Sequence, residues 1–234
     1  MALAAPAQTR YGVTVWNPFG IGGTDDFWEE GGVAVVFMGK SLSGLKPHEI
    51  TKLGICRTFQ NIRLFSELTV RENVMVGNHC RLTTGVWQSV FRTKHQKQEE
   101  ANVLERSDEI LAIVGLTEHS QTIAKNLSYG QQRRLEIARA LASQPKLLLL
   151  DEPAAGMNEK ETNDLFDLIK KIQALGITVL LIEHDMPLVM RICSRIVVLN
   201  FGKKIAEGTP SSIQSNKEVI EAYLGVEEEE EEFA

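Results

Sequence analysis

The sequence has no apolar run long enough to cross a membrane. Its longest apolar runs, such as Val33–Met38 and Leu147–Leu150, have the length of a strand, whereas a bilayer requires roughly 20 residues. The first six residues lack the basic and apolar regions of a secretory signal. Only three cysteines are present, an odd number without CxxC spacing, which argues against a disulfide framework or a zinc site. We therefore expect a protein that is not exported and whose cysteines are reduced.

The chain also lacks a basic excess. It carries 25 basic and 31 acidic residues, for a net charge of −6, but the run Glu227–Glu232 supplies six of the negative charges. Without that run the two signs balance, so nothing in the composition indicates a nucleic-acid partner. A terminal run of like charges is typical of a solvated, disordered tail, which we assign to residues 227–234.

The organisation along the chain is that of an α/β domain with a parallel sheet. Two continuous apolar runs have the character of buried parallel strands, and helical patterns separate them. Residues 1–32 carry little pattern and stay unassigned, whereas residues 33–226 form the domain, with a helical subdomain at about 69–140. The expected elements are strands at 33–37, 147–150 and 177–182, helices at 47–53, 131–143 and 159–175, and a hairpin at 196–206. The last helix has Asn158 as N-cap and Leu165, Leu168, Ile169, Ile172 and Leu175 on one face.

Acidic and imidazole side chains follow two of the predicted strands. Asp151 and Glu152 come directly after the run of four leucines, and His184 follows the next strand. Ligands bind at the carboxyl edge of open α/β sheets, so these residues are expected at one edge. Asp151 is suited to hold Mg²⁺ through water, and Glu152 to orient or deprotonate an attacking water.

A second candidate site lies at the start of the helix after Leu127. Ser128 and Gly130 stand where unpaired amides and the helix dipole favour a phosphate. An ordinary N-cap is the alternative interpretation of the same residues, and the sequence leaves both open.

In this order and spacing, these elements resemble the ATP-binding subunit of ABC transporters. The matching segments are the Q-loop at 58–60, the signature at 127–131, the Walker B segment at 147–152, the D-loop at 154–158 and the switch histidine, His184. Residues 54–65, 152–158 and 221–225 resemble the branched-chain amino acid importers within that family. The resemblance implies an ABC ATPase fold of the P-loop NTPase type and a peripheral place on the cytoplasmic, inner face of the cell membrane.

The resemblance also implies cofactors, roles and partners. ATP and Mg²⁺ are the expected cofactors; Gln60 would contact the metal and couple nucleotide to the membrane subunit, Asp151 would serve the metal, Glu152 the water and His184 the γ-phosphate. The partners would be transmembrane permease subunits, a second ATPase subunit paired head to tail, and indirectly a substrate-binding protein. The signature residues would bind the ATP held by the second subunit: Ser128, Gly130 and Gln131.

The Walker A loop is the motif that we do not recognise. Residues 34–41 fit a relaxed P-loop spacing that ends in Gly39, Lys40 and Ser41. The residues between Ala34 and Gly39 favour an extended strand, however, and Gly44 and Pro47 interrupt any following helix. Residues 20–24 are rich in glycine but have no lysine, and two aspartates follow them. We therefore expect the N-terminal part of the fold to be truncated or replaced.

Two functions of different classes follow from this pattern. The first is an ABC-type ATPase subunit that couples ATP hydrolysis to the import of branched-chain amino acids. The alternative is a non-catalytic pseudo-ATPase adaptor that docks on a permease or on a complete partner ATPase. We also expect the sheet to leave aliphatic side chains of 147–150 and 179–182 exposed where N-terminal strands are missing. ABC-type DNA-repair ATPases are disfavoured, because neither long heptads nor a basic patch is present.

Overall fold

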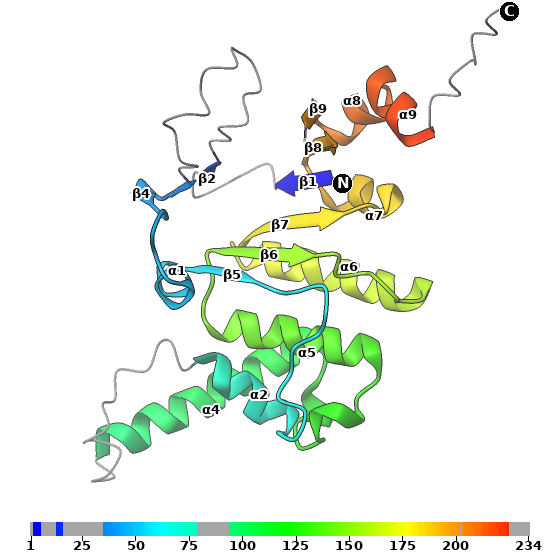
Figure 1. Cartoon of the computed structure of the whole chain (residues 1–234). Helices are drawn as coiled ribbons and strands as arrows, with labels where there is room; N and C mark the ends of the chain where they lie inside the picture. Colours follow the sequence, from blue (N-terminus) through cyan, green and yellow to red (C-terminus); the bar gives the residue numbers. More distant parts are fainter. Residues whose placement is uncertain (1, 6–12, 16–34, 79–93, 202, 225–234) are drawn as a thin grey trace, which may run out of the picture.

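The computed structural model describes residues 2–5, 13–15, 35–78, 94–201 and 203–224 (Figure 1). The centre of the described part is a six-stranded sheet in the order β5-β6-β7-β1-β8-β9. The strands are β5 (Ile55–Arg57), β6 (Leu147–Asp151), β7 (Thr178–Glu183), β1 (Ala2–Ala5), β8 (Arg195–Asn200) and β9 (Lys203–Gly208). Strands β5, β6 and β7 pair in parallel, as expected, whereas β1 pairs antiparallel with both β7 and β8.

The helices are distributed on and beside this sheet. In Figure 1, α6 lies behind β6, while α5, α4 and α2 form a helical layer below it. The pairs α2 with α5 and α4 with α5 are in contact, so these three helices form one packed group. The helices are α1 (Pro47–Leu53), α2 (Val70–Gly77), α4 (Lys94–Val114), α5 (Tyr129–Ala142), α6 (Glu159–Ala174), α7 (Met186–Ile192), α8 (Pro210–Gln214) and α9 (Lys217–Leu224), with 3-10 turns at Thr117–His119 and Ala124–Asn126.

Helix α6 begins where its cap was predicted. The Asn158 side chain accepts from the backbone N–H of Glu161, and the Glu161 carboxylate accepts from the backbone N–H of Asn158. The prediction for Leu175 is wrong: it lies beyond the last helical turn as the C-cap and is 57% exposed. The helix ends because Gly176 adopts a left-handed φ of 82°, which turns the chain before Leu175 can face the core.

One face of the sheet holds the hydrophobic core. Leu148 and Leu150 of β6 lie beside Val179 and Leu181 of β7, and all four are buried in the cluster that includes the apolar faces of α5 and α6. On the opposite face Leu149, Leu180 and Ile182 are only half-buried. The expectation of exposed aliphatic side chains is therefore wrong for the first face and holds in part for the second.

A second sheet contains the segment with P-loop-like spacing. It joins β2 (Val13–Val15), β3 (Val35–Phe37) and β4 (Lys40–Ser41) as antiparallel neighbours. Met38 and Gly39 turn the chain with positive φ values of 50° and 77°, and Val36 pairs with Ser41. Residues 35–41 are therefore a hairpin, in agreement with the extended strand that the sequence predicted for this segment. Residues 20–24 lie outside the described residues.

Further predictions concern cysteines, the tail and membrane spans. Cys56 and Cys193 are buried and form no disulfide, as predicted, while Cys80 and the acidic tail lie outside the described residues. Within the described ranges, no helix has both the length and the apolar character needed to cross a membrane.

Candidate functional site

The predicted catalytic residues meet at the carboxyl edge of β6 and β7. The two strands pair in parallel with Asp151 opposite Ile182, so the residues that follow each strand come together. His184 Nδ1 lies 3.5 Å from Glu152 Oε1, and Gln60 Nε2 donates to Glu152 Oε2 at 2.6 Å. Glu152 is thus held between the predicted coupling glutamine and the predicted switch histidine.

The backbone around Glu152 is tightly turned. Glu152 has a φ of 42°, a left-handed conformation that is rare outside glycine and costs of order 1–3 kcal/mol. The carboxylate of Glu183, only 2% exposed, accepts from the backbone N–H of Ala154 at 3.1 Å and from that of His184 at 3.2 Å. Glu183, which sequence reasoning did not single out, therefore fixes the turn after Glu152 against the end of β7.

Asp151 has a cationic partner that sequence reasoning also missed. Arg57, the last residue of β5, donates from Nη2 to Asp151 Oδ2 at 2.7 Å. The contact arises because β5 pairs in parallel with β6 and both strands end at the same edge. The only signal in the sequence is the position of a basic residue at a strand end, three residues before Gln60.

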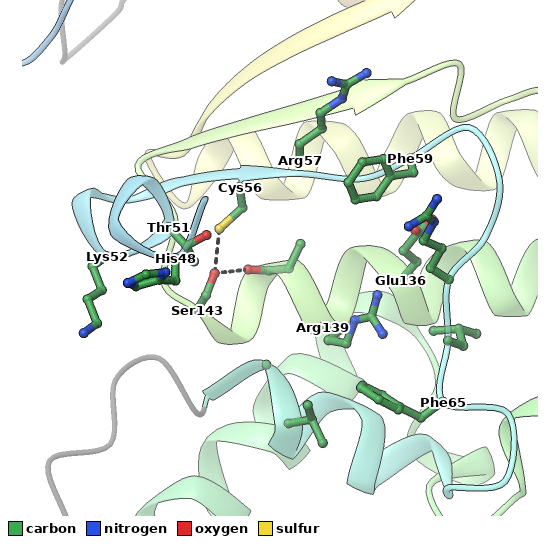
Figure 2. A pocket seen from close by; sticks show the side chains of 15 residues that line it. His48, Thr51, Lys52, Cys56, Arg57, Phe59, Phe65, Glu136, Arg139 and Ser143 are labelled. Atoms are coloured by element: carbon green, nitrogen blue, oxygen red, sulfur yellow. Dashed lines mark hydrogen bonds between the residues drawn. The ribbon is translucent and has the colours of Figure 1, made fainter. Parts of the chain in front are cut away.

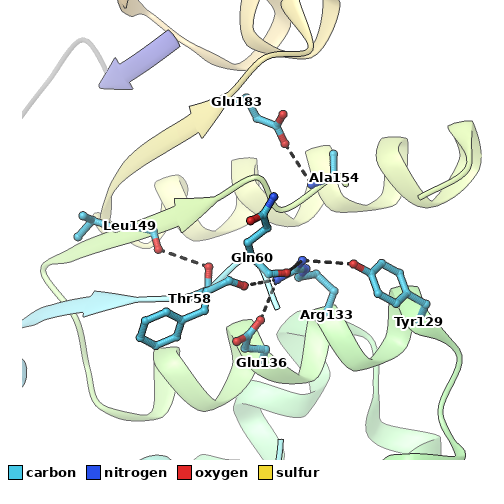
Figure 3. Close-up of polar contacts among 9 residues, drawn as sticks. Thr58, Gln60, Tyr129, Arg133, Glu136, Leu149, Ala154 and Glu183 are labelled. Carbon is cyan, nitrogen blue, oxygen red and sulfur yellow. Dashed lines mark hydrogen bonds and ion pairs between the residues drawn. The ribbon is translucent and has the colours of Figure 1, made fainter. Parts of the chain in front are cut away.

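Arg133 ties helix α5 to the segment that carries Gln60 (Figure 3). Its guanidinium is fully buried and donates to the carbonyl oxygens of Phe59 at 2.6 Å and Gln60 at 2.7 Å. It also pairs with the buried Glu136 at 3.0 Å and lies 3.4 Å from the Tyr129 hydroxyl. The position of Gln60 is thus set from two sides, by the carboxylate that its side chain contacts and by α5 beneath its backbone.

The predicted signature residues form the first turn of α5. Ser128 is the N-cap and its hydroxyl oxygen accepts from the N–H of Gln131, while the side-chain oxygen of Gln131 accepts from the N–H of Ser128. A Cβ at Gly130 would stand 2.6 Å from a carboxylate oxygen of Glu161, so any larger residue would require the Glu161 side chain at the start of α6 to shift. In the single chain this group is a helix cap, and its role toward a phosphate stays a prediction.

A groove of about 890 Å³ lies beside this site (Figure 2). It separates α1 and β5 from α2 and α5. Its walls combine exposed aromatic and aliphatic side chains with cations, and burial lowers the pKa of Arg139 from its ordinary value. The lining residues include Arg57, Phe59, Arg63, Phe65, Glu136 and Arg139.

The donor set at the sheet edge fits magnesium. Within the described ranges, no group of three or more His, Cys, Asp or Glu side chains stands ready to hold a metal. Mg²⁺ commonly uses only one or two carboxylates and takes its other oxygens from water and substrate phosphates. Asp151 and Glu152 offer carboxylate oxygens and Gln60 an amide oxygen, and the Arg57 guanidinium already stands as a cation on Asp151.

Comparisons with known proteins agree with this geometry. The family model described as ABC transporter matches residues 27–155, more than half of the chain. The chain belongs to the ABC transporter family. A second model, described as branched-chain amino acid ATP-binding cassette transporter, matches residues 203–229. This confirms the resemblance found in the sequence and makes the chain an ABC-type ATPase by family.

Curated relatives of this ABC family member cover most of its length. It is 46% identical over 200 residues to the high-affinity branched-chain amino acid transport ATP-binding protein LivG of Escherichia coli. The aligned region covers 85% of this chain and 78% of LivG. It is 47% identical, with the same coverage, to BraF of Pseudomonas aeruginosa, which carries the same description. These comparisons give no support to the alternative of a non-catalytic adaptor.

Solved structures confirm the ABC ATPase fold. A nucleotide-free ATP-binding cassette of an ABC transporter is 33% identical, with a TM-score of 0.68, covering 83% of this chain and 78% of that one. An ATP-binding cassette in its ADP conformation is 32% identical, with a TM-score of 0.67, covering 82% of this chain and 76% of that one.

Proposed function

We propose that this chain is the ATP-hydrolysing subunit of an importer for branched-chain amino acids. The observation that carries the proposal is the 46–47% identity to LivG and BraF over 85% of the chain, together with the C-terminal match to the branched-chain amino acid cassette model. The subunit would work at the inner face of the membrane, where permease subunits and a substrate-binding protein complete the importer.

The residues at the sheet edge would divide the work of hydrolysis. Bound Mg²⁺ supplies positive charge to the phosphates of ATP, and Asp151 would hold it through water. Glu152 would orient and deprotonate the attacking water, and His184 would donate a hydrogen bond to the γ-phosphate. The 2.6 Å contact between Gln60 and Glu152 supports a coupling role for Gln60, because any movement of that segment changes the environment of the proposed base.

The first turn of α5 would serve a second ATPase subunit. Ser128, Gly130 and Gln131 stand at the N-terminus of a 14-residue helix, where backbone N–H groups and the helix dipole favour an anion. In a head-to-tail pair these residues would contact the ATP held by the other subunit. The close packing of Gly130 on α6 supports a fixed position for this turn.

The groove beside Gln60 would receive the permease. Its wall includes Phe59 and Phe65, which are 43% and 49% exposed, and the cations Arg57, Arg63 and Arg139. Exposed aromatic rings flanked by guanidinium groups suit an amphipathic segment that carries carboxylates. Phe59 directly precedes Gln60, so a permease segment in the groove would lie next to the coupling residue.

The test is ATP-driven uptake of leucine, isoleucine and valine by vesicles that contain the reconstituted importer. Glu152→Gln should reduce ATP hydrolysis and uptake by orders of magnitude, because it removes the proposed base. Glu159→Gln, an exposed acid at the start of α6, is the matched control and should leave both unchanged. If hydrolysis survives Glu152→Gln but not Ser128→Arg, this chain serves only the partner's nucleotide. Uptake restricted to other solutes would refute the proposed substrate class.

A further inference from the structure

Arg57 occupies an unusual position for a basic side chain. Its guanidinium forms an ion pair with Asp151 at 2.7 Å, although Asp151 is the carboxylate proposed to serve the metal. The Arg57 side chain is 53% exposed and that of Asp151 only 20%. Figure 2 shows Arg57 directed away from Cys56 and Ser143, which lie on the opposite side of β5. The cation therefore sits at the solvent side of a partly buried acid.

The contact commits one oxygen of Asp151. Oδ2 accepts a charge-assisted hydrogen bond from Arg57, so the positive guanidinium repels a hydrated cation that approaches the same carboxylate. Metal binding then requires either displacement of the guanidinium or sharing of the carboxylate with it. In the first case the lost ion pair, and in the second the repulsion between the two cations, lowers the affinity for the metal.

A second contact stabilises the guanidinium without adding negative charge. The Arg57 guanidinium carbon lies 5.6 Å from the centre of the Phe59 ring, and that of Arg63 lies 5.1 Å from the same ring. Both arginines line the groove, but Arg63 forms no ion pair with a carboxylate in the part of the chain that the structure describes. The chain thus supplies a matched control: two arginines on one ring, of which only Arg57 reaches the metal carboxylate.

We propose that Arg57 is a positioning residue that acts as the internal counter-ion of Asp151 and competes with the divalent cation for that carboxylate. The inference rests on the proposed metal role of Asp151. Arg57 lowers the affinity of Asp151 for free Mg²⁺. A cation that arrives bound to the phosphates of a nucleotide brings additional oxygen ligands, and these overcome the competition from Arg57.

The test is titration of the full-length chain with Mn²⁺ alone. Mn²⁺ is a paramagnetic analogue of Mg²⁺, and electron paramagnetic resonance measures the concentration of free Mn²⁺. Arg57→Gln should bind Mn²⁺ about two- to fivefold more tightly than the wild type, the range expected for loss of a partly exposed ion pair. Arg57→Lys should remain close to the wild type, because it keeps the charge. Arg63→Gln should change the affinity by much less than Arg57→Gln at physiological salt. Thermal melting should show a larger stabilising effect of Mg²⁺ on Arg57→Gln than on the wild type.

The variant Asp151→Asn distinguishes the competition by Arg57 from the proposed metal role of Asp151. The double variant Arg57→Gln/Asp151→Asn should bind Mn²⁺ no better than Asp151→Asn, because the competition requires the carboxylate. If Asp151→Asn weakens Mn²⁺ binding but Arg57→Gln leaves it unchanged or weaker, the competition is refuted and the metal role of Asp151 stands. If Asp151→Asn has no effect, or if neither the wild type nor Arg57→Gln binds Mn²⁺, the inference fails together with that metal role.

Discussion

Replacement of Arg133 by methionine should be among the most damaging single changes in this chain. Arg133 is fully buried, and so is the Glu136 carboxylate with which it pairs, with side-chain exposures of 0% and 3%. Arg133→Met leaves the Glu136 carboxylate buried without the cation that it pairs with, so that only the electrostatic interaction with Arg139 remains. Breaking a buried ion pair from one side costs about 3–5 kcal/mol.

The same reasoning predicts recovery in a double variant. Arg133 Nε and Glu136 Oε1 have no hydrogen-bond partner among the described residues, so the pair does not recover its full desolvation cost. The carbonyls of Phe59 and Gln60 lie in an exposed segment, where water can replace the guanidinium. Arg133→Met/Glu136→Leu should therefore regain most of the lost stability, since apolar replacement of both partners is often neutral or stabilising.

Urea unfolding of the three chains measures this directly. Arg133→Met should also melt about 6–20 °C lower, at roughly 2–4 °C per kcal/mol for a chain of this size. Arg134→Met, the neighbouring and only half-buried arginine of α5, is the control and should cost about 1 kcal/mol or less. Hydrogen exchange in residues 58–65 should quicken in both Arg133 variants. The reasoning is refuted if Arg133→Met costs less than Arg134→Met, or if the double variant is no more stable than the single one.

Three further changes test other parts of the fold. Gly77→Ala places a Cβ 2.2 Å from the carbonyl oxygen of Arg139, so α2 must shift away from α5. The free energy of unfolding, measured in urea, should fall by about 1–3 kcal/mol. An unchanged urea midpoint would contradict this packing. Asn158→Ala removes the N-cap of α6 and should lower the free energy of unfolding by about 1 kcal/mol in the same assay. Asn163→Ala, which replaces an asparagine inside the helix and not at its cap, is the comparison. Burial raises the pKa of the Cys193 thiol to about 12, so iodoacetamide should label it slowly in the folded chain at pH 8 and rapidly in urea. Because folding raises the pKa of the thiol, the protein keeps its full stability below the unfolded pKa of about 8.5 and loses stability as the pH rises above that value. Cys193→Ala should remove this loss of stability at alkaline pH.

Local chemistry was sufficient to predict many of the elements. The N-cap of α6 follows from Asn158 and Glu161 alone, and α1 spans the predicted residues because Pro47 opens it and Gly54 closes it with a φ of 103°. The predicted strand of four leucines extends one residue further, through Asp151. These features depend on residues within one turn or one strand of each other, so the sequence displays their causes directly.

Contacts that depend on register could not be predicted in the same way. Arg57 and Asp151 are 94 residues apart, and their ion pair exists only because β5 and β6 end at the same edge of the sheet. Arg133 and Arg134 are adjacent and chemically identical, yet the rotation of α5 buries one and leaves the other half-exposed. Strand β1 lies between β7 and β8 although its four residues carry no strand pattern that the sequence analysis recognised.

These register-dependent contacts converge on the short segment from Arg57 to Gln60. Arg57 reaches Asp151 and Gln60 reaches Glu152, while Phe59 lines the groove. Arg133 holds the carbonyls of Phe59 and Gln60 to α5, so this segment is tied both to α5 and to the carboxylates at the sheet edge. The segment from Arg57 to Gln60 therefore forms a wall of the groove and also supplies the polar partners of Asp151 and Glu152.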